Sequence, residues 1–253
     1  MSLIRDTGLI FSRSLQITLR NPVWLIFGLF QPLCFFLLFA PLLEKLVGNP
    51  SFGAASSLLI FTPGLLIMTA MYGTAYVGMG LIDDIRSGVI ERFRVTPINR
   101  VALLLGRSLR DVFFLIVQSV FLVILAWLFG LSAPLAGILL SFGLVMLVGF
   151  TLSVLSYSAA MILKSEDALA PALNFFLLPV QLLAGVLLPL TLAPGWLQWI
   201  AFLNPLAHAV DAARALFCGA YTDATVFWGF GAMIVAALVA FYWAASLFRK
   251  AAE

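Results

Sequence analysis

The chain has 253 residues, of which 63% are hydrophobic and only 10% are charged. Soluble domains carry about 25% charged residues, so this composition excludes a soluble globular protein and indicates an integral membrane protein. The net charge of +3 does not indicate nucleic-acid binding, because the basic residues lie at the ends of apolar stretches. The two cysteines, Cys34 and Cys218, do not suggest a disulfide framework, and we expect two buried thiols.

The first 20 residues combine charged and apolar side chains with a helical period. Arg5, Arg13 and Arg20 fall on one helical face, whereas Ile4 and Phe11 fall on another. This pattern is typical of an amphipathic helix that lies in the interface plane of a membrane. A short cytosolic extension with no special role is the alternative.

Six apolar stretches are each long enough to cross a bilayer as a helix, which takes about 20 residues. The third and the fourth come from one uncharged run, Val112–Leu163, which the breaker sequence Gly130–Pro134 divides. Pro171, Pro179 and Pro189 predict kinks in the fifth stretch. The predicted fold class is therefore an all-α polytopic membrane protein, with spans at residues 22–43, 58–82, 112–130, 135–163, 168–190 and 224–248.

Between the fifth and sixth spans, residues 191–217 contain two pieces that are each too short to cross the membrane. The first piece ends at Asn204-Pro205, and the second carries His208 and Arg214. A helix rises about 1.5 Å per residue, so neither piece can cover a hydrocarbon core of about 30 Å. We expect a re-entrant helical hairpin in the outer leaflet. The alternative is a seventh span, which would put the C-terminus outside.

The distribution of positive charge favours six spans with both termini in the cytoplasm. Cytoplasmic segments of membrane proteins are enriched in Lys and Arg, and a seventh span would export Arg249 and Lys250. With six spans, only Lys45 and Arg214 lie outside. The other 12 of the 14 basic residues lie inside: Arg5, Arg13, Arg20, Arg86, Arg92, Arg94, Arg100, Arg107, Arg110, Lys164, Arg249 and Lys250.

Polar side chains inside the spans mark candidates for a substrate path. In the second span, Thr69, Tyr72 and Tyr76 share one helical face, next to a stripe of small residues that we expect to pack against another helix. Gln118 lies in the third span, and Asn174 and Gln181 share roughly one face of the fifth. The tyrosine face borders a substrate path or is a packing surface. The amides either join helices or line a polar cavity, and the sequence leaves these alternatives open.

The sequence lacks the motifs of an ATPase and of an ion-coupled transporter. It contains no GxxxxGK[ST] phosphate loop, and its single histidine, His208, excludes a histidine metal cluster. Ion-coupled transporters usually keep ionisable groups within their spans. Here Asp111 lies only at the start of the third span, beside Arg107 and Arg110, and we expect it to pair with these arginines. We therefore expect no cofactor on this chain, and any transport energy to come from another subunit.

The segment 83–110, which joins the second and third spans, holds six of the 14 basic residues. We expect it to lie in water as a cytoplasmic loop running into the third span. Its residues before Pro97 have one apolar and one charged helical face, which predicts a short amphipathic helix that ends there. The loop either associates with anionic lipid or accepts force from a protein partner, and its mixed charges favour the protein. The smaller connection at residues 164–167 faces the same side and is expected to touch the same partner.

Several short motifs, in order along nearly the whole chain, make the sequence similar to one known family. They are RNPVW at residues 20–24, Gln31-Pro32, Thr62-Pro63-Gly64, RSGVIERFRVTPINRVALLLGR at residues 86–107, Ser165-Glu166, LLAGVLLPLTLAPGW at residues 182–196, and Asn204-Pro205 followed by DAARAL. Each motif is weak alone, but together they resemble the membrane subunit of ABC exporters of the ABC-2 type, such as the daunorubicin-resistance and nodulation lipo-oligosaccharide permeases. The long extracellular domain of sterol and lipid members of the wider group is not seen, which favours the compact type of the bacterial inner membrane.

The resemblance implies a pair of permeases, as a homodimer or with a related permease, on an ATP-binding cassette ATPase dimer that holds ATP and Mg. It implies that residues 1–20 and the loop helix contact the ATPase, and that substrate leaves between the permeases along spans 1, 2 and 5. The residues expected to couple to the ATPase are Arg86, Val89, Glu91, Arg92, Phe93, Arg94, Lys164, Glu166 and Asp167. Those expected along the path are Thr69, Tyr72, Tyr76, Gln118, Asn174 and Gln181.

The leading functional hypothesis is ATP-driven export of an amphipathic drug, lipid or lipid-linked glycan out of the cytoplasm or the inner leaflet. The alternative is a non-transport membrane scaffold whose basic loop recruits a cytosolic partner. An intramembrane enzyme would need a catalytic constellation, which the sequence does not contain.

Overall fold

The computed structural model describes residues 3–20, 30, 32–38, 57–88, 100–187 and 190–250, and the regular elements in these ranges are all helical. This confirms the all-α fold class. Most of the first predicted span and the predicted amphipathic helix before Pro97 lie outside the described residues. The helices are α1 (Leu3–Arg20), α3 (Ser57–Ala75), α4 (Gly78–Arg86), α6 (Arg100–Leu128), α7 (Leu135–Leu163), α8 (Glu166–Leu182), η2 (Leu190–Leu192), α9 (Gly195–Phe202), α10 (Pro205–Phe217) and α11 (Ala224–Lys250).

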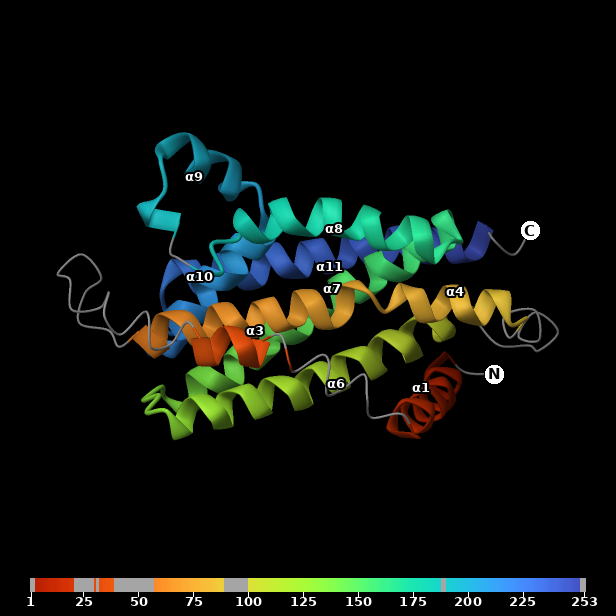
Figure 1. The fold of residues 1–253 in the computed structure, drawn as a ribbon, viewed down its shortest axis with the longest axis horizontal. Helices are drawn as coiled ribbons and strands as arrows, with labels where there is room; N and C mark the ends of the chain where they lie inside the picture. Colours follow the sequence, from red (N-terminus) through yellow and green to blue (C-terminus); the bar gives the residue numbers. More distant parts are fainter. Residues whose placement is uncertain are drawn as a thin grey trace.

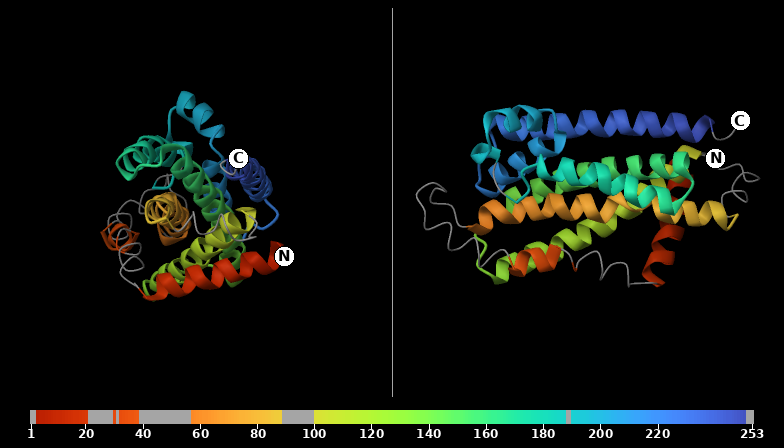
Figure 2. Two further views of the ribbon diagram at one scale, coloured as in Figure 1. Left: turned by 90° about the vertical axis from the view of Figure 1, so that its right-hand side faces the viewer. Right: turned by 45° about the horizontal axis from the view of Figure 1, so that its top comes forward.

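These helices form an elongated bundle with two different ends (Figure 1). The helix α7 contacts α3, α4, α6, α8, α10 and α11, so it forms the centre of the bundle. Both chain termini lie at one end, together with the starts of α6 and α8, and we name this the termini end. The helices α9 and α10 lie at the opposite end, which we name the α10 end (Figures 1 and 2).

Four helices of the described chain are long and apolar enough to cross a membrane: Leu58–Arg86, Val101–Leu128, Leu135–Leu163 and Ala224–Phe248. They correspond to the second, third, fourth and sixth predicted spans. In the place of the fifth span, α8 is 17 residues long, and the first span is described only in part. The six-span topology therefore stays a prediction.

The second span is interrupted, because α3 ends at Ala75 and α4 begins at Gly78. The Gly78 N–H donates to the Ser156 hydroxyl of α7 at 2.9 Å. A Cβ atom on Gly78 would lie 2.4 Å from the Ser156 carbonyl oxygen, so only a glycine lets the two backbones come this close. The small residues of this stripe, Ala70, Thr74 and Gly78, are all buried, so the stripe is a packing surface, as predicted.

The structure corrects the predicted boundary between the basic loop and the third span. Because α4 extends to Arg86 and α6 begins at Arg100, both ends of the predicted 83–110 loop are helical. The expectation that the arginines of this loop lie in water is wrong for Arg107 and Arg110, whose side chains are 12% and 23% exposed. Each forms an ion pair with a carboxylate, which compensates the burial of its charge.

The fifth predicted span, 168–190, is helical only as far as Leu182. Gly185 has a φ of +65°, a left-handed conformation that favours glycine, and it turns the chain away from the helix axis. The predicted pair of short helices then follows as α9 and α10. Between them the side-chain oxygen of Asn204 accepts from the Leu206 N–H at 3.1 Å, which caps α10. The position of this pair relative to a bilayer stays a prediction.

The helix α1 lies across the long helices at the termini end (Figure 2). It packs against α6 where Gly106 leaves room for Ile10: a Cβ atom on Gly106 would lie 2.8 Å from that side chain. Phe11 also meets Phe113 of α6 edge to face, with 6.3 Å between ring centroids. Further apolar side chains of α1 remain exposed, as an interfacial helix requires, although this membrane position stays a prediction.

Candidate functional site

Two tyrosine–amide pairs join the second span to α8, and we name them the tyrosine–amide seam. The Tyr72 hydroxyl donates to the side-chain oxygen of Gln181 at 2.5 Å. The Tyr76 hydroxyl donates to the side-chain oxygen of Asn174 at 2.5 Å. Four of the six residues predicted for the substrate path therefore come together in space, from two segments about 100 residues apart.

The other two predicted path residues lie in the packed interior and outside this seam. Thr69 is 1% exposed, and its hydroxyl donates to the Leu65 carbonyl one turn earlier in α3 at 2.8 Å. Gln118 of α6 is 6% exposed, and its side-chain oxygen lies 3.3 Å from the position that a Cβ atom on Gly73 would occupy. Gln118 thus packs against α3 from the side of α6.

The surroundings of the seam are uncharged and partly open. The helix α3 contains no charged residue, and α8 contains none after Asp167. Only Leu169 and Leu177 of α8 are buried, whereas Phe175 and Phe176 are 75% and 67% exposed. Hydroxyl and amide groups within an aromatic, apolar surface suit a ligand that has both polar and apolar parts.

At the termini end, an ion pair joins the end of α4 to the start of α8. Arg86 Nη1 lies 3.0 Å from Glu166 Oε1, and both side chains are partly exposed. Lys164, which ends α7 with a φ of 50°, and Asp167 belong to the same connection. The basic segment 83–110 and the connection at residues 164–167, which were predicted to face the same side of the membrane, are therefore in contact. The other predicted coupling residues lie outside the described residues: Val89, Glu91, Arg92, Phe93 and Arg94.

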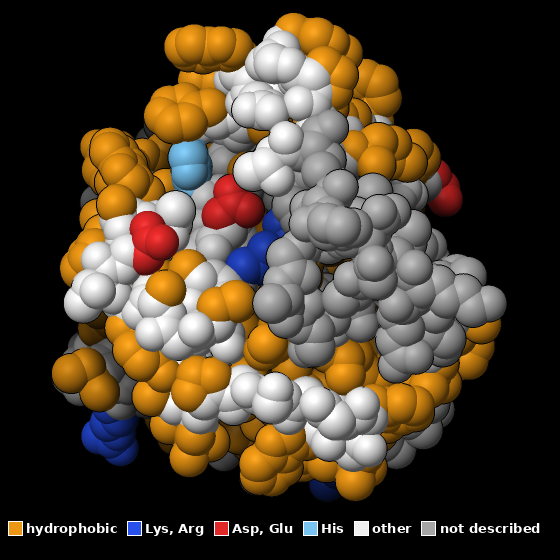
Figure 3. All heavy atoms as spheres, turned by 90° about the vertical axis from the view of Figure 1, so that its left-hand side faces the viewer, with side chains coloured by type: hydrophobic (Ala, Val, Ile, Leu, Met, Phe, Trp, Pro, Cys, Tyr) orange, Lys and Arg blue, Asp and Glu red, His pale blue; other side chains and the backbone are white. Residues whose placement is uncertain are grey.

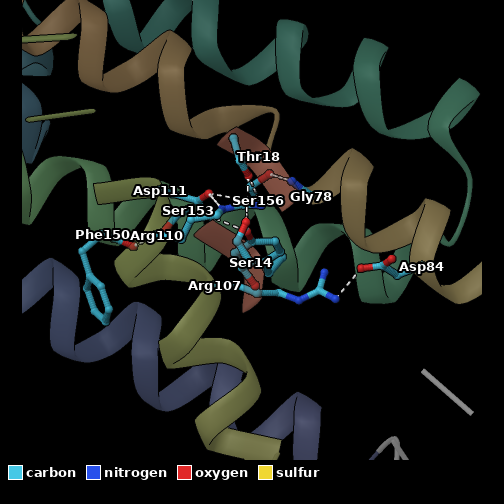
Figure 4. Close-up of polar contacts among 11 residues, drawn as sticks. Ser14, Thr18, Gly78, Asp84, Arg107, Arg110, Asp111, Phe150, Ser153 and Ser156 are labelled. Carbon is cyan, nitrogen blue, oxygen red and sulfur yellow. Dashed lines mark hydrogen bonds and ion pairs between the residues drawn. The ribbon is translucent and has the colours of Figure 1, made fainter. Parts of the chain in front are cut away.

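A buried polar cluster ties α1, α6 and α7 together near the same end (Figure 4). Arg110 Nε donates to Asp111 Oδ1 at 2.9 Å, and the Tyr157 hydroxyl donates to Asp111 Oδ2 at 2.6 Å. Arg110 also donates to the hydroxyl oxygens of Tyr157 at 3.3 Å and Thr18 at 3.4 Å. The sequence did not single out Tyr157, because its carboxylate partner lies 46 residues away in the chain.

The pairing expected for Asp111 is confirmed for Arg110 and wrong for Arg107. The guanidinium of Arg107 forms its ion pair with Asp84 of α4 instead (Figure 4). Two separate ion pairs thus compensate the charges of Arg107 and Arg110 on α6. One is formed with α4 and the other lies within the polar cluster. The pair of Arg107 with Asp84 was not predicted from the sequence, since the two residues lie on different helices.

The α10 end holds a second site, built around an arginine for which we predicted no role from the sequence. Arg214 is 9% exposed, and its guanidinium donates to the carbonyls of Ile60 at 3.1 Å, Gly185 at 2.6 Å and Val186 at 3.3 Å. A carboxylate oxygen of Asp211 lies 3.5 Å from it. Burial lowers the pKa of the Arg214 guanidinium, which still keeps its proton at neutral pH, as arginine does throughout proteins.

Figure 3 shows this end of the molecule, where acidic and basic side chains lie beside the single histidine on a largely apolar face. The Nε2 atom of His208 lies 2.9 Å from the Phe202 carbonyl oxygen. The Asn204 side-chain amide donates to the Val180 carbonyl of α8 at 2.8 Å. The available sequence signal for this site was a short helix that carries His208, Asp211 and Arg214 among apolar residues.

These sites offer hydrogen bonds, ion pairs and apolar surface, which suit ligand binding and contacts between helices. Within the described ranges, no three His, Cys, Asp or Glu side chains lie close enough together to hold a metal ion.

The sequence matches the family model described as ABC-2 type transporter over residues 5–218. A protein of Cyanophora paradoxa named as a transport permease, ycf38, is 31% identical over 204 residues, which are 78% of this chain and 69% of the relative. The daunorubicin resistance ABC transporter permease protein DrrB1 of Streptomyces coeruleorubidus is 28% identical over 200 residues, which are 78% of this chain and 70% of the relative. YbhR of Escherichia coli, named as a multidrug ABC transporter permease, is 21% identical over 61% of this chain and 42% of its own length.

Because the family model covers most of the sequence, the chain belongs to the ABC-2 type transporter family. It is a multi-pass transporter permease subunit, and its family implies an ATP-binding cassette partner.

Proposed function

We propose that this ABC-2 family member is the transmembrane permease of an ATP-driven exporter, which moves an amphipathic drug, lipid or lipid-linked glycan out of the cytoplasm or the inner leaflet. The tyrosine–amide seam carries the proposal. It places hydroxyl and amide groups in an uncharged, partly exposed strip along the second span and α8. Such a strip can follow the polar part of an amphipathic molecule while the neighbouring aromatic rings contact its apolar part.

We also propose a topology of six spans in a bacterial inner membrane, with the termini end in the cytoplasm. The charge distribution supports it, since 12 of the 14 basic residues belong to segments assigned to that side. In this topology α1 lies in the inner interface. The pair α9 and α10 is a re-entrant hairpin of the outer leaflet, where Trp196 and Trp199, both strongly exposed, suit the interface.

The energy for transport enters at the termini end, from an ATPase dimer that binds ATP and Mg. The ion pair between Arg86 and Glu166 supports this placement, because it makes the two connections at this end one contact surface. The proposed ATPase contact comprises α1 and the residues Arg86, Val89, Glu91, Arg92, Phe93, Arg94, Lys164, Glu166 and Asp167.

A second permease, identical or related, completes the path. The support is the low burial of α8, which leaves most of its side chains exposed beside the tyrosine–amide seam. Spans 1, 2 and 5 of each copy then face the substrate, and Tyr72, Tyr76, Asn174 and Gln181 line its route. Thr69 and Gln118 act one layer behind this route, through packing.

The proposal is tested by purifying the permease with the products of its neighbouring genes and measuring ATP-dependent uptake of amphipathic compounds into inside-out vesicles. The double variant Tyr72→Phe/Gln181→Leu removes one pair of the seam. We expect transport to fall by about fivefold, since a hydrogen bond of this kind contributes about 1 kcal/mol. The matched control is Tyr242→Phe, an equally conservative change at a side chain of α11 that is 79% exposed.

Three results would count against the exporter. No ATPase accompanies the permease, or the ATPase ignores every amphipathic compound offered, or the Tyr72→Phe/Gln181→Leu variant transports at the wild-type rate. The first two results would favour the scaffold function. A separate test concerns coupling: exchanging the charges in Glu91→Arg/Arg92→Glu is expected to leave membrane insertion intact while ATP hydrolysis no longer drives transport.

A further inference from the structure

The end of α8 leaves backbone carbonyls that no further helical turn can satisfy, because the helix stops at Leu182. Two side chains of the α9–α10 region take up carbonyls of this segment. The Asn204 amide donates to Val180 at 2.8 Å. The Arg214 guanidinium donates to the carbonyls of residues 185 and 186 at 2.6 and 3.3 Å. The α10 end of α8 is therefore held by α10, through the backbone.

The same guanidinium reaches the second span. Arg214 Nε donates to the Ile60 carbonyl of α3 at 3.1 Å. One helical turn farther on, a Cβ atom on Gly64 would lie 2.1 Å from the Val186 carbonyl oxygen, so the two backbones are in direct contact here. Arg214 thus bonds both sides of the closest approach between α3 and the segment after α8.

The contacts of α8 and α10 with the bundle differ in kind. Along α10 most side chains are buried, so this helix is fixed by apolar packing. In α8 only two of 17 residues are buried, Leu169 and Leu177, and each joins an apolar cluster that also contains residues of the second span. The helix also has polar links to that span: the tyrosine–amide seam and the ion pair between Arg86 and Glu166. A helix with little buried apolar area can separate from its neighbour at a low cost once these polar contacts are released.

We propose that Arg214 is a positioning residue for transport, which closes the α10 end of the substrate path by holding α3 and the segment after α8 together. The path opens toward this end when Arg214 releases the carbonyls of residues 185 and 186 while it stays on α10. The inference rests on the proposed transport function and assigns a role that the family match does not.

The contacts with carbonyls, rather than the ion pair, carry this role. The carboxylate of Asp211 is 46% exposed and its oxygen lies 3.5 Å from the guanidinium, so the ion pair contributes little. Arginine presents five N–H donors in a rigid planar fork, which allows one side chain to bond carbonyls from two segments at once. Lysine keeps the charge but has a single ammonium group, and it cannot reproduce this geometry.

The first experiment measures exposure of the contact itself and needs no transport assay. Val186 is 1% exposed, and Val186→Cys provides a probe in a background with Cys34→Ser and Cys218→Ser. In membranes, a membrane-impermeant maleimide added from the outside is expected to label this cysteine slowly. Adding Arg214→Gln is expected to raise the labelling rate by about tenfold or more, since bonds from a charged donor are lost.

Two further variants make the labelling result specific. Arg214→Lys is expected to label at an intermediate rate, whereas Asp211→Asn, which removes only the weak ion pair, is expected to stay within about twofold of the parent. Equal labelling in the Arg214 variants and the parent would overturn the proposal. So would an Asp211→Asn rate as high as that of Arg214→Gln, because the ion pair would then be the restraint.

The second experiment compares transport with ATP hydrolysis in vesicles that contain the permease and its ATPase. Premature opening is expected to lower the amount of substrate moved per ATP by about tenfold in Arg214→Gln, with a smaller loss in Arg214→Lys. A merely structural role would lower transport and hydrolysis in parallel with the amount of folded protein, and that outcome would also overturn the proposal. If the wild-type complex shows no transport, the proposed function fails, whereas the labelling experiment still decides whether Arg214 holds this contact closed.

Discussion

The buried ion pair between Arg110 and Asp111 allows a quantitative prediction, because its two members differ in exposure. The Arg110 side chain is 23% exposed, whereas that of Asp111 is 3% exposed. Removing one member of a buried pair costs about 3–5 kcal/mol, because the other charge is left without compensation. Arg110→Gln leaves the deeper charge, so its cost should lie near the upper limit. Asp111→Asn leaves a charge that water can reach, so its cost should lie near or below the lower limit.

A double-mutant cycle measures the coupling within this pair. The variants are Arg110→Gln, Asp111→Asn and the double variant, which has no buried charge left at this point. We expect the double variant to lose less stability than the sum of the single losses, with a coupling energy of about 2 kcal/mol or more. The assay is reversible unfolding in mixed micelles with increasing sodium dodecyl sulfate, followed by the fluorescence of the six tryptophans.

The control for this cycle is Arg86→Gln, which breaks an ion pair whose arginine side chain is 54% exposed. Its cost should be below about 1 kcal/mol, as is typical of pairs at the surface. Additive single losses, or a larger loss for Asp111→Asn than for Arg110→Gln, would refute the reasoning from burial.

Two further predictions concern packing and coupling. Gly78→Ala should cost about 1–3 kcal/mol, because the new Cβ atom would lie 2.4 Å from a carbonyl oxygen of α7, whereas Gly80→Ala, with open space around its Cβ atom, should be neutral or slightly stabilising in the same unfolding assay. The single variants Arg86→Glu and Glu166→Arg should each lower ATP-driven transport, and the two together should restore much of it, because the exchanged pair has the same sign of interaction. A double variant no better than the single ones would show that the contact between α4 and α8 is not needed for coupling.

The sequence predicted most of the fold because the bilayer imposes a simple length rule. Uninterrupted apolar runs longer than about 20 residues gave the second, third, fourth and sixth spans as helices. The rule does not predict where a helix ends, because the end depends on contacts with other parts of the chain. The helix α8 stops at Leu182 within an apolar run, because Gly185 turns the chain and the side-chain amide of Asn204, which caps α10, donates to the Val180 carbonyl of α8.

The distribution of charge led to a wrong start for the third helix, which was predicted at residue 112 and begins at Arg100. An arginine near the end of an apolar run lies in water or pairs with a carboxylate, and the sequence cannot show which partner lies beside it in space. Arg107 pairs with Asp84, which belongs to another helix, and Arg110 pairs with its neighbour Asp111 and contacts Tyr157. Both arginines therefore extend α6 toward its start instead of lying in a loop.

For the candidate site, too, the sequence predicted features within one helix but not the contacts between helices. Helical spacing brought Tyr72 and Tyr76 onto one face and the amides of α8 onto another, so the sequence could predict each half of the seam. It could not show that the two faces meet, since that depends on the packing of α3 and α8 in the bundle. The contacts of Arg214 could not be predicted from the sequence for a further reason. Its partners are backbone carbonyls, which every residue carries, so no side-chain pattern in α3 or after α8 could mark them.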